Sequence, residues 1–161
     1  PPPPPPPPPP FFFHAYAAIR DPLWSRGLGD VYKRQVFLIA SFGSTMVILY
    51  GYPDSPFAQP KNIFFGHLLT SFVGVIFVSF IQLPLFIILP LAVGFGVGLM
   101  ILFNVPHPPA GGNPIIVILG SVSFDYLLNP IMVGSIIIIV FGIILNKFIL
   151  KKKYPKNNLF A

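Results

Sequence analysis

Residues 62–124 read NIFFGHLLTSFVGVIFVSFIQLPLFIILPLAVGFGVGLMILFNVPHPPAGGNPIIVILGSVSF and contain no Asp, Glu, Lys or Arg. Near the end of this uncharged stretch, prolines at positions 106, 108 and 109 flank His107. In hydrocarbon every backbone N–H and C=O needs an internal partner, so a helix break persists only where protein or a water-filled cavity lines it. The region around His107 is therefore the first candidate for a functional site.

The composition of the whole chain indicates a membrane protein. Of its 161 residues, 54% are hydrophobic and only 9% are charged, and the mean hydropathy is +0.78. A single soluble domain of this length could not bury so much apolar surface. The formal net charge is +6, but all the basic residues except Lys61 gather in two clusters near the ends, 20–34 and 147–156. Nucleic-acid binding favours a basic stripe interleaved with aromatic residues, so the expected partner is the lipid bilayer and not nucleic acid.

Apolar runs and helix-breaking residues divide the chain into membrane segments. Three runs approach the length of about 20 helical residues that crosses a hydrocarbon core, namely 63–81, 85–103 and 131–150. Two shorter apolar runs, 36–51 and 115–119, accompany them. The sequence therefore predicts an all-α, polytopic membrane protein with three full-length transmembrane helices and two short or broken membrane helices.

The first 35 residues differ from the rest of the chain. Ten prolines and three phenylalanines precede a mixed-charge segment that has neither helical nor strand periodicity. A stiff polyproline-II spacer or ligand is one interpretation. We favour the other, a non-native or disordered lead-in at 1–35 that contributes nothing to fold or activity. The transmembrane domain then occupies 36–150, and a basic C-terminal tail follows at 151–161.

Glycine spacing suggests an internal repeat of one short and one long element. Glycines at 43, 51, 66 and 74 are separated by 8, 15 and 8 residues, and those at 112, 120, 134 and 142 by 8, 14 and 8. Chance is the alternative, because glycine is frequent in membrane helices. A real repeat would pair residues 42–45 with 111–114, the openings of the two short helices.

Such openings have a chemical meaning. Transporters are often built from internal repeats whose broken helices meet near the bilayer midplane, with helix N-termini directed at an anionic substrate. The first N–H groups of a helix lack intrahelical partners and carry the positive end of its macrodipole, so they hold an anion without Lys or Arg. We expect a small monovalent inorganic anion to bind there, near the imidazoles. The candidate substrate-binding residues are Gly43, Ser44, Thr45, His67, His107, Gly111, Gly112 and Asn113.

Four motifs in order resemble one known family. They are SFGST at 41–45, PDSPFAQPKN at 53–62, GHLL at 66–69 and HPPAG at 107–111. Together they resemble the HPP family of integral membrane proteins, over about residues 40–146. The resemblance implies a small multi-helix membrane transporter, and some cyanobacterial and plastid members of the family are linked to nitrite uptake.

The chain departs from the family pattern at two points. Family members usually have another membrane helix before the first motif, so the resemblance implies N-terminal truncation. The family tends to have Ala-Gly-Ala after the prolines, where this chain has Ala110-Gly111-Gly112.

Each candidate residue also has a structural interpretation. His107 either binds substrate or a proton, or satisfies carbonyl groups that its neighbouring prolines leave free. His67 either titrates or hydrogen-bonds a neighbouring helix. Asp54, among Pro53, Ser55 and Pro56, is typical of a surface turn. No His or Asp after the lead-in stands three or four residues from another, so we expect no metal site and no cofactor.

Nothing in the sequence predicts an enzyme. There is no cysteine, nucleophile elbow, phosphate-binding glycine loop or pair of carboxylates. The leading interpretation is membrane transport of a small solute. The alternative is a non-transporting membrane scaffold or sensor subunit, in which His107 only shapes a kink.

Two features bear on assembly and orientation. Small residues four apart, Gly66, Thr70 and Gly74 on one helix and Gly94 and Gly98 on the next, are typical of packing seams, and such seams could also form a homo-oligomer. Lysines crowd the end of the last helix, so the positive-inside tendency predicts a cytoplasmic C-terminus in the cell (inner) membrane.

Overall fold

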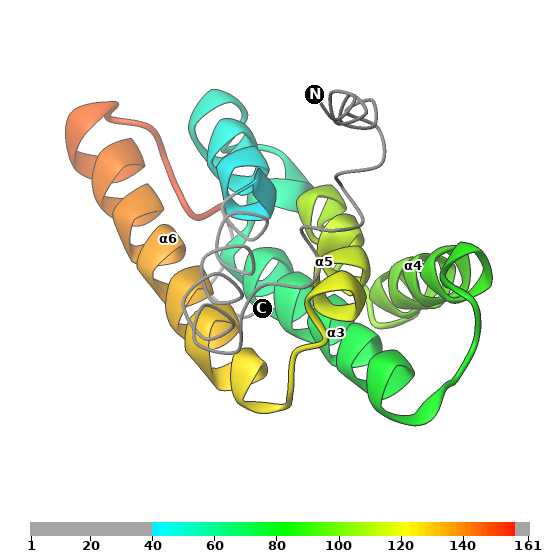
Figure 1. Cartoon of the computed structure of the whole chain (residues 1–161). Helices are drawn as coiled ribbons and strands as arrows, with labels where there is room; N and C mark the ends of the chain where they lie inside the picture. The colour runs from blue at the N-terminus through cyan, green and yellow to red at the C-terminus, as the bar shows by residue number, and fades with distance from the viewer. Residues whose placement is uncertain (1–39, 157–161) are drawn as a thin grey trace, which may run out of the picture.

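The structure, a computed structural model, describes residues 40–156, and all the regular structure among them is helical (Figure 1). The α-helices are Ala40–Gly51, α3 (Pro60–Phe80), α4 (Leu85–Leu102), α5 (Asn113–Gly120) and α6 (Val133–Ile144), of which Ala40–Gly51 and α5 are the two short apolar ones. Short 3-10 turns at Pro56–Ala58 and Pro108–Gly112 precede α3 and α5, and π-helical segments at Leu127–Met132 and Leu145–Ile149 extend α6 at both ends.

Three helices are long and apolar enough to cross a membrane, as the sequence predicts. They are Pro60–Phe80, Leu85–Leu102 and Leu127–Ile149. The third begins four residues before its predicted start, and it is kinked there, because Asn129 before Pro130 has an extended backbone (φ −132°, ψ 114°). A residue that precedes proline avoids the helical conformation for steric reasons.

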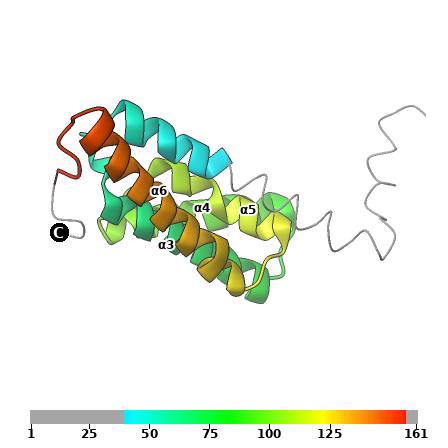
Figure 2. The same cartoon turned by 90° about the vertical axis from the view of Figure 1, so that its left-hand side faces the viewer.

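The bundle places α4 and α6 on opposite sides of α3 and α5 (Figure 1). At one end Ile118 packs against Ile88 and Ala92 near the α3–α4 turn. At the other end Leu49 packs with Tyr154. The end of the helix Ala40–Gly51 and the C-terminal segment therefore lie together (Figure 2).

Glycine contacts follow the predicted repeat. The helices α3 and α6 each present two glycines, eight residues apart, to the short segment of the other half. The four contacts are Gly66 with His107, Gly74 with Val117, Gly134 with Phe42 and Gly142 with Leu49. A Cβ added at Gly66 or Gly74 would lie 2.7 Å or 2.8 Å from its neighbour's Cβ, which leaves no room for a side chain.

The predicted seam on α4 is different. A Cβ at Gly94 or Gly98 would have no atom within 4 Å, so neither glycine packs against another described helix. Gly96 takes that place, since its Cβ would lie 3.5 Å from Thr70 Cγ2 on α3. Two glycines four apart indicated a close contact, but not which face of α4 makes it.

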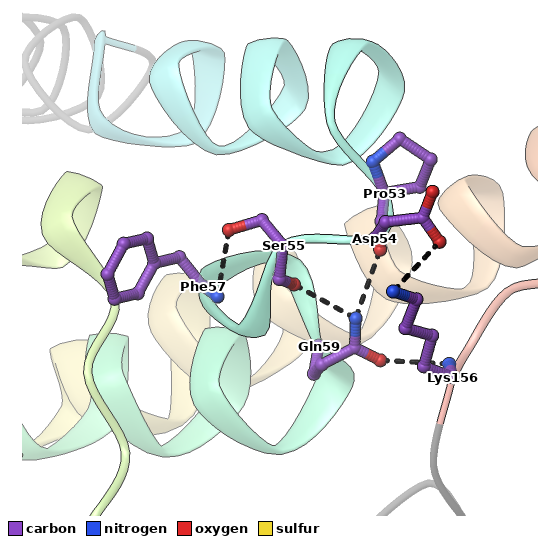
Figure 3. A network of polar contacts seen from close by, with 6 residues as sticks. All are labelled: Pro53, Asp54, Ser55, Phe57, Gln59 and Lys156. Carbon is purple, nitrogen blue, oxygen red and sulfur yellow. Dashed lines mark hydrogen bonds and ion pairs between the residues drawn. The ribbon is translucent and has the colours of Figure 1, made fainter.

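The loop before α3 is held by the C-terminal segment (Figure 3). Gln59 Nε2 donates to the carbonyls of Pro53 and Ser55, both at 3.0 Å, and Gln59 Oε1 accepts from the backbone N–H of Lys156 at 3.0 Å. Lys156 Nζ also lies 3.4 Å from Asp54 Oδ1. These contacts fix the loop that presents the Phe57 carbonyl to the bundle interior.

Candidate functional site

Six buried polar side chains form one cluster, called here the polar cluster: Ser41, Thr45, His67, Ser71, His107 and Asn113. Each is at most 7% exposed. Ser41 and Thr45 belong to the helix Ala40–Gly51, and His67 and Ser71 to α3. Because residues four apart share a helix face, each helix directs two polar groups to the same place. The break before α5 adds His107, and Asn113 opens α5.

Thr45 lies between the two histidines. Its Oγ1 is 2.9 Å from Nε2 of His67 and 2.9 Å from Nε2 of His107. The two imidazole rings meet edge to face, with centroids 4.9 Å apart. One hydroxyl group thus connects a histidine of α3 with the histidine of the break.

Asn113 extends the network on the other side of His67. Its Nδ2 is 3.0 Å from His67 Nδ1 and 3.0 Å from Ser71 Oγ. Its Oδ1 accepts from Ser41 Oγ at 2.8 Å, and Ser41 Oγ is also 2.8 Å from the Pro109 carbonyl. Ser71 is the twelfth of the 21 residues of α3, so this end of the cluster lies midway along a spanning helix.

His107 faces the loop before α3. Its Nδ1 donates to the Phe57 carbonyl at 2.7 Å. Because Pro60 has no N–H, it cannot bond back to that carbonyl in a tight turn. His107 therefore satisfies a carbonyl of another loop, and not one freed by the prolines beside it.

The structure brings together four of the predicted site residues, Thr45, His67, His107 and Asn113. Ser44, also a candidate substrate-binding residue, does not reach the cluster: its side chain is exposed and its Oγ donates to the Ala40 carbonyl at 3.0 Å.

The predicted glycines also lie outside the cluster's hydrogen bonds. Among residues 40–156, a Cβ at Gly43 or Gly112 would meet no packing partner within 4 Å, and one at Gly111 would meet Val97 alone, at 3.5 Å. The glycine that approaches the site most closely is Gly66, whose missing side chain makes room for His107.

Ser41 and Ser71 are site residues that the sequence analysis did not assign. The signal for both was present, because each stands four residues from an assigned residue, Thr45 or His67, on an apolar helix. Polar side chains that recur at helical spacing in membrane sequence predict a common polar face.

A hollow of about 350 Å³ lies against the cluster. It is lined by Val97, Met100, Ile101, Pro106, His107 and Pro108. Among the described residues, no group of three or more His, Cys, Asp or Glu could hold a metal ion. The site therefore offers hydroxyl, amide and imidazole groups beside an apolar hollow.

Three spanning helices around a buried polar cluster define an integral membrane protein. The profile of the family described as "HPP, transmembrane region" matches residues 10–155, and the chain belongs to this family. The match includes much of the lead-in at 1–35, which lies outside the described residues.

Two relatives from Dictyostelium discoideum are named transmembrane proteins. One is 35% identical over 129 residues, covering 73% of this chain and 44% of the relative, and the other is 32% identical over 136 residues, covering 78% and 42%. The chain thus spans less than half the length of either relative. No solved structure matches the chain.

Proposed function

We propose that the chain transports a small solute across a membrane, and that the solute is a monovalent inorganic anion such as nitrite. The observation that supports this proposal best is the polar cluster itself. It is buried where the two halves of the glycine repeat meet, since Ser41 of the first half bonds Asn113 of the second. A buried group of polar side chains in membrane sequence generally marks a solute or ion pathway.

The two short helices run in opposite directions from their meeting point. Ser41 on one helix bonds Asn113 on α5. From there the first helix continues to Leu49, beside Gly142, while α5 continues to Ile118, at the other end of the bundle. Broken helices that diverge from a shared polar site are the usual frame of a transporter binding site.

An anion is the solute class that best fits the groups present. Residues 62–124 hold no charged side chain, and a bare charge buried in a membrane is costly. The hydroxyl, amide and imidazole donors of the polar cluster give partial positive charge without Lys or Arg. At the opening of α5 the Asn113 N–H bonds the Ala110 carbonyl and Pro114 has no N–H, so side chains supply the donors. Nitrite is the member of this class that the family resemblance implies. The hollow beside His107 would give the anion access to the cluster.

A scaffold or sensor subunit is the second candidate. It is favoured by the direct hydrogen bonds that close the polar cluster, and by the apolar lining of the hollow apart from His107. In that case His107 would hold the loop at Phe57 in place and would bind neither a solute nor a proton.

Uptake into liposomes distinguishes the two functions. The full chain is reconstituted, and nitrite entry is measured against protein-free vesicles, which report leakage of nitrous acid through lipid. We expect entry above leakage, and its loss in His107→Ala protein that still reconstitutes. Entry equal to leakage at every nitrite concentration would exclude nitrite transport and favour the scaffold.

We further propose that the C-terminus is cytoplasmic in the inner membrane of the cell. The lysines at 147, 151, 152, 153 and 156 support this orientation by the positive-inside tendency.

A further inference from the structure

The polar cluster contains an unbroken series of hydrogen-bond contacts between two backbone carbonyls. It runs from Pro109 O through Ser41, Asn113, His67, Thr45 and His107 to Phe57 O. The six contacts measure 2.8, 2.8, 3.0, 2.9, 2.9 and 2.7 Å. Each is short enough to hold a proton between its two atoms.

This series has one proton too few when both imidazoles are neutral. A hydroxyl has one proton, a neutral imidazole has one N–H, and an amide presents N–H on one side and oxygen on the other. The members Ser41, Asn113, His67, Thr45 and His107 therefore place five protons in the six contacts.

The shortage falls at Ser41 when the amide oxygen of Asn113 faces that residue. The single hydroxyl proton of Ser41 then has two acceptors, Asn113 Oδ1 and Pro109 O, each 2.8 Å away. One contact is left as two facing oxygens, which repel each other. The contact of Thr45 Oγ1 with the Ser41 carbonyl, at 3.1 Å, adds an acceptor and no proton.

One additional proton fills every contact if the side-chain amide of Asn113 is flipped by about 180°, so that Nδ2 faces Ser41 and Oδ1 faces His67. The flip leaves the shape of the side chain unchanged. His107 then donates from both nitrogens, to Phe57 O and to Thr45. Thr45 donates to His67 Nε2, and His67 Nδ1 donates to the amide oxygen. The amide N–H and Ser41 complete the series to Pro109 O. The flip loses one hydrogen bond, the 3.3 Å contact of the Asn113 amide with the His67 carbonyl. The contact with Ser71 is kept, because the Ser71 hydroxyl can donate to the amide oxygen.

We infer that the polar cluster binds one proton together with one anion, so that the protein moves the two as a neutral pair. This inference rests on the proposed anion transport. Burial disfavours a lone imidazolium. The titratable groups that face each other here are His67 and His107. The acidic residues of 40–156 lie elsewhere, Asp54 beside Lys156 and Asp125 exposed. An anion in the hollow beside His107 supplies the missing negative charge. The proton comes from water, forms the second N–H bond of the imidazole, and returns to water when that bond breaks, with no change of oxidation state.

Proton entry coupled to anion entry tests the inference. Liposomes containing the full chain and an internal pH dye receive an inward nitrate gradient, because nitrate has no neutral acid form that leaks at neutral pH. Potassium and valinomycin set the membrane potential. We expect internal acidification with one proton per nitrate, at a rate independent of potential. Anion entry that follows the potential without acidification would overturn the coupling and leave anion transport standing.

A second readout does not depend on transport. In the full chain carrying ¹⁵N-histidine, nitrogen chemical shifts distinguish neutral from doubly protonated rings. Spectra of His67→Gln and His107→Gln protein assign the signals. Of the His67 and His107 rings, we expect one to be doubly protonated at pH 7 in saturating nitrite or nitrate, and neither in the absence of an anion; the signal of the third histidine, His14, is the one that both variants retain. Two neutral rings in both anions would overturn the inference even if uptake is found.

Asn113→Asp places a fixed carboxylate where the amide contacts His67. Because it replaces the charge of the anion, we expect one doubly protonated ring in this variant without any added anion. Neutral His67 and His107 rings in folded, reconstituted Asn113→Asp protein would contradict the proposed charge balance.

Discussion

Gly66 is the residue on which the position of His107 depends most directly. A methyl group there would lie 2.7 Å from His107 Cβ, a backbone-fixed atom that cannot turn away. In an unobstructed helix interior, Gly→Ala stabilises by about 1 kcal/mol. Gly66→Ala should instead displace His107 and weaken its contacts with Thr45 and the Phe57 carbonyl.

The expected result is a fall in anion uptake of roughly tenfold or more. A buried hydrogen bond left without its partner costs about 1–3 kcal/mol, and about 1.4 kcal/mol corresponds to tenfold. Gly94→Ala is the matched control, because that glycine is also inside a spanning helix but has no atom near its added Cβ. Equal initial uptake rates for the two variants would show that the Gly66 contact does not position the site.

At the same scale, the sequence predicted the site's central residues but not its edges. Proline flanks and the absence of nearby charge identified His107, and helix openings pointed to Thr45 and Asn113. The same argument predicted Ser44, which belongs with Thr45 to the helix opening at 42–45. Its side chain points away, because neighbouring residues on a helix are about 100° apart. Ser41, one turn before Thr45, faces the cluster instead.

Among the elements, the loop before α3 connects the site to the C-terminal segment. The Tyr154 hydroxyl donates to the Ala58 carbonyl at 2.7 Å, next to the carbonyl that His107 bonds. Burial raises the pKa of Tyr154, which lies outside the spanning helices, above its ordinary value. The phenol of the folded protein therefore keeps its proton at pH values where an exposed tyrosine loses it.

Tyr154→Phe should destabilise the protein by about 1 kcal/mol at neutral pH, the usual net value of one hydrogen bond. Above about pH 10 the unfolded chain ionises Tyr154 and the folded chain does not, so stability falls as pH rises. Phenylalanine does not ionise, so this loss of stability occurs at position 154 in the parent protein and not in Tyr154→Phe. The difference in stability between the parent and Tyr154→Phe should therefore shrink between pH 9 and pH 11. The melting temperatures of the two proteins in detergent measure this difference. A difference that stays constant from pH 9 to pH 11 would argue against a buried phenol.

Element bounds were largely predictable, because apolar runs end where prolines, Asn or lysines begin. The start of the third span was missed, since Leu127 and Leu128 precede a proline that should end a helix. Which face of each helix packs inward was not predictable, as Gly94 and Gly96 illustrate. All sides of α4 are apolar, so the sequence carried no periodic signal for its buried face.

For the whole molecule, the ion pair of Asp54 with Lys156 places the loop before α3 and the C-terminal segment at one end. This is the arrangement expected if the short segments cross the membrane with the long ones. Because the chain has no cysteine, single cysteines can report sidedness without background.

An impermeant thiol reagent should label Tyr52→Cys and Asn157→Cys from the cytoplasmic side, and Ser123→Cys from the opposite side. Tyr52 and Ser123 are exposed, at opposite ends of the bundle. Labelling of positions 52 and 123 from the same side would contradict the topology. External labelling of position 157 would contradict only the proposed orientation.

The central claim is that the polar cluster, and not only the fold around it, moves the anion. The most direct test compares Thr45→Val with Ser44→Ala in nitrite uptake by reconstituted full chain. Valine keeps the shape of threonine but removes the hydroxyl between His67 and His107. Ser44→Ala removes a neighbouring hydroxyl that, within the part of the chain the structure describes, bonds the Ala40 carbonyl of its own helix. The account predicts that Thr45→Val reduces uptake to the leakage of protein-free vesicles and that Ser44→Ala takes up nitrite like the parent. Parental uptake by correctly reconstituted Thr45→Val protein would contradict it.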